Sequence, residues 1–479
     1  METVEGGRRL SFVRQVAMLA GGTALGQGLV VAASPILTRL YTPHDFGVYA
    51  VALSLWTILT AVATLRYEMA IPMPADSRRA AALTWLCMAI AVGVTALCAA
   101  GIAAGGDALA RWLGTPQLAA VLPWVPVGLL GAALYQVAHY WVSRAQRFGV
   151  LSATRVVRSV GQVGWQLGWG WVQPGPLGLV LGWVVSQYLG IVALLRRVPL
   201  PRSGLRVTLW KEVAGAYRRF PLYTTWASLL TVMGTQLAPV LFTRFFTAEV
   251  AGHFSMALRV LVLPSSLLGQ AVGQVLYPRL AAQRAGAEAD DCRTLERLAA
   301  MLLLMAVPVF AFLAVCGRSF FSWVFGQPWA LAGTFAQMMA PWLLVSFVSS
   351  PLSTYALVRE RHRQAFWVTV YETVLRLGAI IVGGWMGSSR VAVGLFSAAG
   401  VIISVVYLAW MLRLAGSGLG RLVWALRGWL ILALVLVGVT EVARWHLEPA
   451  LAVAMAMAGW SGYAVAAWTA VLRRKGHVW

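Results

Sequence analysis

The pentapeptide TRLYT at residues 38–42 returns later in the chain as TRFFT at residues 243–247. The match continues without a gap at the same spacing, through the pairs Gly47 and Gly252, Tyr49 and Phe254, and Ala52-Leu53 and Ala257-Leu258. Chance similarity between two apolar helices does not readily align Thr, Arg, Thr and Gly in one register. We therefore interpret the pattern as an internal duplication.

Apolar segments surround both copies and run through the whole chain. Of the 479 residues, 60% are hydrophobic and 11% are charged, whereas soluble domains carry about 25% charged residues. A helix needs about 20 apolar residues to cross a bilayer. The sequence predicts an all-α membrane protein of about fourteen transmembrane helices, at residues 15–40, 46–65, 80–103, 117–143, 149–171, 176–196, 221–245, 250–278, 296–316, 329–357, 364–386, 390–412, 424–442 and 449–472.

Basic residues favour one side of this predicted topology. The net charge is +22, and most arginines fall in every second loop when the N-terminus is placed in the cytoplasm. This positive-inside pattern predicts a multi-pass inner-membrane protein with both termini cytoplasmic. The first apolar run is too long for a cleaved signal peptide. Nucleic acid is not an expected partner, because no segment forms a contiguous basic surface.

The duplicated segments join the first two predicted helices and the seventh and eighth. Six helices separate the copies, so both have the same topology, and the repeat axis runs along the membrane normal. We expect an N-terminal lobe at residues 1–200, a C-terminal lobe at residues 201–415 and two further helices at residues 416–479. Two six-helix lobes that face a central cleft suit a transporter with alternating access. A channel does not require two such lobes.

Charged residues in or beside the spans are the candidates for function. A charge at the bilayer centre costs about 2.5–3.5 kcal/mol on insertion scales, so it should face a wet cavity or a partner. The candidates are Arg39, Arg66, Arg259 and Arg376 for an anionic ligand, and Glu68 and Glu372 for ion coupling. Each carboxylate also lies close in sequence to one of these arginines, so a salt bridge is the alternative role.

Two other basic regions allow more than one interpretation. Arg155 and Arg158 share a face of the fifth predicted helix, and either line a cavity or extend to the cytoplasmic interface. The longest predicted cytoplasmic connection, residues 197–220, is either a plain basic linker or an amphipathic helix on the inner leaflet. Apolar residues recur in it at four-residue spacing, namely Leu205, Leu209, Val213 and Tyr217.

The sequence lacks the motifs of soluble catalysis. It contains no GxxxxGK[ST] phosphate loop, no HExxH and no GxSxG. The four cysteines form no CxxC pair. We therefore expect a protein that is not an enzyme and that has no metal and no cofactor.

Three segments carry recognisable motifs: residues 24–72 with SPILTRLY at 34–41, residues 217–223 with YRRFPLY, and residues 251–280 from AGHF to VLYPRL. Together they resemble the polysaccharide transporter (Wzx-like) family of the multidrug/oligosaccharidyl-lipid/polysaccharide flippase superfamily. The resemblance implies a flippase for oligosaccharides linked to undecaprenyl pyrophosphate, in O-antigen, capsule or exopolysaccharide synthesis. It also implies that the partners are the lipid-linked oligosaccharide, membrane lipids, a polysaccharide polymerase and a chain-length regulator.

Other functions remain open at this point. An ion-coupled multidrug exporter of the same fold would need acidic residues in its cleft, and the spans contain mainly basic ones. A membrane-embedded polymerase or glycosyltransferase usually has a large external loop, and no predicted loop here exceeds about 25 residues. A lipid II flippase is also compatible with the sequence.

Overall fold

The computed structural model describes residues 21–264, 288–359, 361–446 and 449–473, which are helical wherever they form regular structure. The chain forms two compact units, which we call the N-terminal unit, ending at Gly252, and the C-terminal unit, beginning at His253. This division by compactness does not test the lobe boundaries expected from the duplication. Those boundaries therefore stay a prediction.

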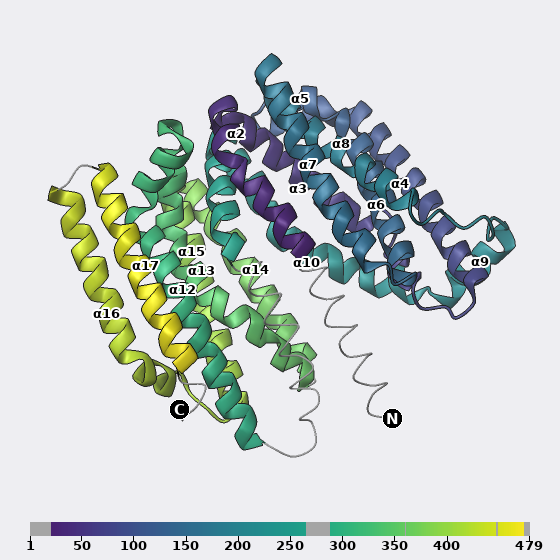
Figure 1. Cartoon of the computed structure of the whole chain (residues 1–479). Helices are drawn as coiled ribbons and strands as arrows, with labels where there is room; N and C mark the ends of the chain where they lie inside the picture. The colour runs from purple at the N-terminus through teal and green to yellow at the C-terminus, as the bar shows by residue number, and fades with distance from the viewer. Residues whose placement is uncertain (1–20, 265–287, 360, 447–448, 474–479) are drawn as a thin grey trace. The chain divides into compact units, whose positions relative to one another are not determined.

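The N-terminal unit is built from helices that pack side by side (Figure 1). Its elements are α2 (Ser34–Leu40), α3 (Pro43–Val62), the 3-10 helix η1 (Tyr67–Ala70), α4 (Ser77–Trp112), α5 (Gln117–Val121), α6 (Trp124–Arg144), α7 (Phe148–Val172), α8 (Pro176–Leu195), α9 (Val207–Ala216), the π-helix η2 (Phe220–Thr224) and α10 (Thr225–Phe245). α3 packs against α6, α8 and α10, and therefore lies at the centre of the unit.

The C-terminal unit also consists of long helices. Its elements are α12 (Glu288–Phe325), the 3-10 helix η3 (Gln327–Trp329), α13 (Ala330–Val358), α14 (His362–Trp385), α15 (Ser389–Leu414), α16 (Leu419–His446) and α17 (Pro449–Arg473). α13 packs on α12 and α15, and α15 packs in turn on α14. The last two helices, α16 and α17, pack on α12 (Figure 1).

The membrane fold is confirmed, whereas the number of fourteen spans is not. Ten helices of the described part are long and apolar enough to cross a membrane. α6 and α7 are long helices at predicted positions but are not among the ten, and α7 contains several polar side chains. The predicted spans 15–40 and 250–278 extend partly outside the described residues.

The duplication has a structural counterpart at its best-matched stretch. Thr42 caps α3, and its Oγ1 accepts a hydrogen bond from the backbone N–H of Asp45 at 3.2 Å. Thr247 precedes the helical residues 248–264 in the same way, and its Oγ1 accepts from the N–H of Val250 at 3.2 Å. The two threonines and their two donors are matched positions of the repeat. The repeated TRxxT sequence therefore encodes the same helix start twice.

These two helix starts also cross each other. A Cβ atom on Gly47 would overlap the backbone carbonyl of Ala248, and a Cβ atom on Gly252 would overlap the carbonyl of Pro43. Residues 43 and 47 are the repeat partners of residues 248 and 252, so the contact is reciprocal. Glycine at both positions lets the two backbones approach more closely than any side chain would allow.

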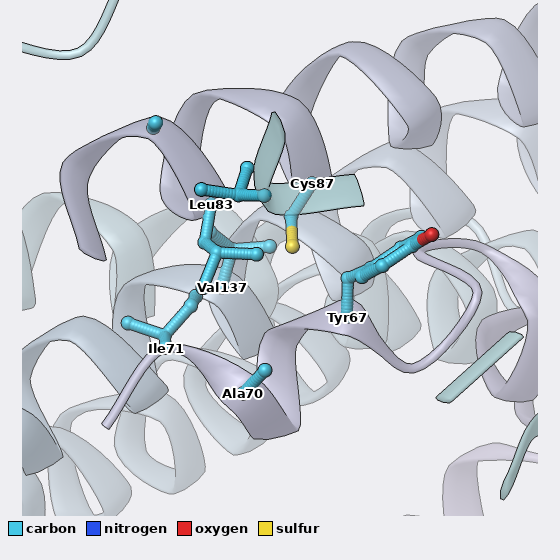
Figure 2. Close-up of a cluster of buried hydrophobic side chains, with 8 residues drawn as sticks. Tyr67, Ala70, Ile71, Leu83, Cys87 and Val137 are labelled. Carbon is cyan, nitrogen blue, oxygen red and sulfur yellow. The ribbon is translucent and has the colours of Figure 1, made fainter. Parts of the chain in front are cut away.

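A buried cluster fixes the other end of α3. Tyr67, Ala70 and Ile71 of η1 and its end pack against α4 and α6 (Figure 2). Val213 of α9 joins the same cluster, and Leu209 packs against it. The amphipathic helix expected in residues 197–220 is therefore present as α9, with part of its apolar face buried on the unit. Leu205 lies outside α9 and is 58% exposed, so its assignment to that apolar face is wrong.

Candidate functional site

A cavity of about 450 Å³ lies inside the N-terminal unit, between α3, α6, α8 and α10. A few small or apolar residues complete its wall, but most of the lining is polar or aromatic. These residues are Thr57, Thr60, Arg66, Tyr135, Gln136, His139, Tyr140, Trp183 and Gln187. We call this space the Arg66 cavity. It contains a cation, amides, hydroxyls and aromatic rings within one helical unit.

Arg66 reaches this cavity through an unusual backbone turn. Leu65 and Arg66 follow α3 with φ angles of 49° and 60°. Two consecutive non-glycine residues in the left-handed region are strained, and such strain is concentrated at functional sites. The turn ends α3 and starts η1, which places the Arg66 side chain between α3 and α6. Its guanidinium Nε is buried and has no hydrogen-bond partner among the described residues.

Glu68 lies beneath Arg66 and is fully buried. Its carboxylate accepts hydrogen bonds from the Thr64 hydroxyl and, at 2.8 Å, from the Gln136 amide. It also forms a salt bridge with Arg66, with 3.5 Å between Nη1 and Oε1. The salt bridge suggested by the sequence is thus present. The hydrogen bonds compensate the burial of this charge, and they hold Arg66 and Gln136 at the cavity wall.

A second arginine contacts two residues of the cavity wall. Arg158 of α7 donates from Nη2 to Oε1 of Gln187 at 2.6 Å. Its guanidinium carbon also lies 4.0 Å from the centre of the Tyr135 ring. Both partners line the Arg66 cavity, which favours the interpretation in which Arg158 faces a cavity over the one in which it extends to the cytoplasmic interface. Its neighbour Arg155 contacts Thr23.

The amide of Gln187 is bonded at its oxygen but not at its nitrogen among the described residues. Gln187 is 1% exposed and lines the Arg66 cavity, and its Nε2 has no hydrogen-bond partner among the described residues. A buried donor without a partner costs about 1–3 kcal/mol. An oxygen-rich ligand or water in the cavity would satisfy it.

An aromatic stack forms another part of the wall. The rings of Trp56 and Trp183 are 4.2 Å apart and nearly parallel. Trp56 is fully buried, and its Nε1 donates to the Val125 carbonyl at 2.7 Å. Trp183 lies between this fixed ring and the cavity. Aromatic rings held in this way present flat apolar faces to a ligand at low entropic cost.

The C-terminal unit contains the other predicted charge pair. Arg376 donates to Oε1 of Glu372 at 2.9 Å, one turn away on α14. Its guanidinium also lies 4.0 Å from the ring centre of Trp342 and 4.2 Å from that of Phe396. Arg376 is therefore held by one carboxylate and two aromatic rings, and its side chain is 14% exposed.

The remaining predicted arginines have different environments. Arg39 lies in the last turn of α2 and is exposed. Between Arg39 and Arg66 runs the 20-residue helix α3, which spans about 30 Å. The structure thus places these two residues at opposite ends of α3 rather than together. Arg259 belongs to the C-terminal unit, is half-buried and has an interaction partner.

Most residues of the cavity wall have no recognisable signal in the sequence. Tyr135, Gln136, Trp183 and Gln187 lie in apolar helices, where a single amide or ring has no recognisable motif. The available signal was a glutamine in each of two helices, α6 and α8, at positions that pack together. No cluster of three or more His, Cys, Asp or Glu side chains suited to a metal ion occurs among the residues that the structure describes.

Two known proteins are similar to this chain in sequence. WzxC, a lipopolysaccharide biosynthesis protein of Escherichia coli (strain K12), is 26% identical over 175 residues, which are 36% of this chain and 35% of WzxC. The match thus spans about a third of that relative. The succinoglycan biosynthesis transport protein ExoT of Rhizobium meliloti (strain 1021) is 23% identical over 379 residues, 75% of this chain and 72% of ExoT.

Solved structures share the fold at low sequence identity. The lipid II flippase MurJ in an inward closed conformation has a TM-score of 0.76 and 10% identity, covering 97% of this chain and 100% of MurJ. A point mutant of the Vibrio cholerae MATE transporter VcmN has a TM-score of 0.53 and 14% identity, covering 87% of this chain and 98% of VcmN. At these identities the likeness shows the fold alone. The name of the sequence relative ExoT describes a transport protein, in agreement with the expectation that the chain is not an enzyme.

The family itself is shown by sequence. The profile of the family described as polysaccharide biosynthesis protein matches residues 36–333, which is more than half of the chain. The matched region contains the duplicated TRxxT segments, the strained turn at Arg66 and the cavity lining. The resemblance stated from sequence is therefore confirmed, and the chain belongs to the polysaccharide biosynthesis protein family of multi-pass membrane proteins.

Proposed function

We propose that this chain moves a lipid-linked oligosaccharide across the membrane and that the Arg66 cavity receives part of its polar head. The observation that carries the proposal is the cavity wall. It combines the guanidinium of Arg66, the Nε2 donor of Gln187, which has no partner among the described residues, and the ring of Trp183. Phosphate oxygens and sugar hydroxyls bind to guanidinium and amide donors, and sugar rings pack on aromatic faces.

The cavity favours this ligand over a cationic drug. An exporter of cations would present carboxylates to its substrate. Glu68 is the carboxylate nearest to Arg66 in sequence, but it is fully buried, satisfied by three partners and absent from the cavity lining. The cavity therefore offers hydrogen-bond donors and a cation rather than a negative charge.

The finer proposal is a flippase for undecaprenyl-pyrophosphate-linked repeat units, in O-antigen, capsule or exopolysaccharide synthesis. The names of WzxC and ExoT, which refer to lipopolysaccharide and succinoglycan, support this substrate class. In this scheme the duplicated lobes alternate access across the inner membrane, with both termini cytoplasmic. Arg39, Arg259 and Arg376 supply further positive charge, and Glu68 and Glu372 couple an ion. A polymerase and a chain-length regulator receive the product.

A deletion strain tests the function directly. Loss of a flippase should cause lipid-linked repeat units to accumulate on the cytoplasmic leaflet, as measured by their protection from an external glycan-modifying enzyme. If the repeat units instead reach the outer leaflet and remain unpolymerised, the chain is a polymerase and the proposal fails. Restored efflux of a fluorescent cation by the chain would favour the drug exporter.

Arg66→Ala is expected to lower translocation by the complemented strain by about tenfold to a hundredfold, because a charge-assisted hydrogen bond contributes about 1.5–3 kcal/mol. Arg66→Lys should retain part of the activity. Arg363→Ala, an exposed arginine of α14 outside the cavity, serves as the control and should leave translocation unchanged. Equal activity of the Arg66→Ala and Arg363→Ala proteins, at matched membrane levels, would contradict the assignment of Arg66.

A further inference from the structure

A second cavity lies in the N-terminal unit where the N-terminal ends of α4 and α9 approach each other. Its volume is about 760 Å³. The charged residues that line it are Asp76, Arg78, Arg79, Arg202, Arg206 and Glu212. It shares no lining residue with the Arg66 cavity.

The two acidic side chains of this second cavity already have partners. Asp76 caps α4 and accepts from the backbone N–H of Arg78 at 2.8 Å. Glu212 forms a salt bridge with Arg79 at 2.6 Å. In contrast, the guanidinium groups of Arg78, Arg202 and Arg206 have no hydrogen-bond or ion-pair partner among the described residues. The cavity therefore presents uncompensated positive charge.

The loop that carries two of these arginines is held in place. The indole N–H of Trp85 donates to the Pro201 carbonyl at 3.1 Å, and that of Trp210 donates to the Gly204 carbonyl at 2.7 Å. Gly204 has a φ of +88°, and a Cβ atom there would lie 2.6 Å from the backbone nitrogen of Ala82. The loop thus packs directly on α4. The backbone of Arg202 and Arg206 is therefore held on α4 in the absence of a ligand.

Exposed apolar side chains lie at the rim of this second cavity, and a soluble anion would not need them for binding. Leu205 and Val207 flank Arg206 and are each 58% exposed. Trp85 and Trp210 lie half-buried beside the same loop. Tryptophan is typical of the membrane interface, and exposed apolar side chains next to a cation suit a ligand that joins a phosphate to an acyl chain.

We infer that this cavity binds the phosphate group of an anionic membrane lipid, with Arg202 and Arg206 as its principal donors. The backbone N–H groups at the start of α9 add to the attraction, because Arg206 at the N-cap supplies no side-chain acceptor for them. The bound lipid would hold α9 and the loop before it against the membrane surface. The inference concerns lipid binding alone and stands apart from the translocated substrate.

Binding can be measured on the detergent-purified full chain by native mass spectrometry. The titrants are phosphatidylglycerol, phosphatidylcholine and inorganic pyrophosphate. The double variant R202A/R206A is expected to weaken phosphatidylglycerol binding about thirtyfold. Each basic side chain near an anionic lipid surface raises the affinity about fivefold, and the variant removes two of them. Binding of phosphatidylcholine should not change.

The control is the double variant R361A/R363A, which removes two exposed arginines outside the cavity. It should bind phosphatidylglycerol as the unaltered chain does. Equal weakening in both double variants, or none in R202A/R206A, would overturn the site. Competition of pyrophosphate with phosphatidylglycerol at equal affinity would overturn the lipid as its ligand and leave a soluble phosphate instead. Since Arg202 and Arg206 are exposed and unpartnered among the described residues, neither substitution is expected to impair folding.

Discussion

Gly47→Ala is expected to destabilise the N-terminal unit by about 3 kcal/mol, near the upper end of overpacking costs. The added Cβ atom would overlap the backbone carbonyl of Ala248. A backbone group cannot rotate away as a side chain can, so the start of α3 and residues 248–252 must separate. We expect a lower melting temperature of the purified chain, a lower membrane level and loss of translocation. Gly252→Ala should give the same result, because its Cβ atom meets the carbonyl of Pro43.

The matched control is Gly168→Ala, also within a helix. A Cβ atom at Gly168 would meet no heavy atom within 4 Å. Replacing an exposed helical glycine by alanine stabilises a helix by up to about 1 kcal/mol. The Gly168→Ala protein should therefore melt at the same temperature as the unaltered chain or higher. If Gly47→Ala and Gly168→Ala melt alike, the close crossing is not the constraint described here.

Glu68→Ala should cost about 3–5 kcal/mol, the range measured when one partner of a buried ion pair is removed. The carboxylate is fully buried and satisfies Arg66, Gln136 and the Thr64 hydroxyl. Its removal leaves a cation and two polar groups without their acceptor. The measurement is the melting temperature of the purified chain, together with translocation. Glu68→Gln keeps the shape of the side chain and one acceptor oxygen. Its melting temperature should therefore fall between those of the unaltered chain and the Glu68→Ala protein.

A second glutamate provides the comparison. Glu212 pairs with Arg79 at 2.6 Å, but both side chains are about half exposed, at 52% and 54%. Exposed pairs contribute about 0–1 kcal/mol. Glu212→Ala should thus leave the melting temperature nearly unchanged. A loss at Glu212 as large as that at Glu68 would show that burial does not decide the cost of these pairs.

The fold could be predicted largely from the sequence because local signals determine it. Long apolar runs predict helices that a bilayer requires, and the threonines of the repeated TRxxT stretch mark the starts of two helices. The number of spans could not be settled, since α7 combines helical length with Arg155, Arg158 and two glutamines. Hydropathy alone does not tell whether such a helix faces lipid or packs within a unit.

The candidate site was predictable only where its residues are close in sequence. Arg66 with Glu68, and Glu372 with Arg376, lie two and four residues apart, and both pairs are present. The rest of the cavity depends on how α6 and α8 pack, which brings Gln136 and Gln187 to one space. The strained turn at Leu65 and Arg66 has no sequence signal either, because neither residue is glycine or asparagine.

The reciprocal crossing has a consequence for the later history of a duplicated gene. After duplication, two copies are free to drift apart wherever their surroundings differ. Here each copy forms part of the environment of the other, since Gly47 packs against Ala248 and Gly252 packs against Pro43. A bulkier residue acquired by one copy would clash with the backbone of the other copy. Both positions are therefore restricted to small residues for as long as the two helices cross.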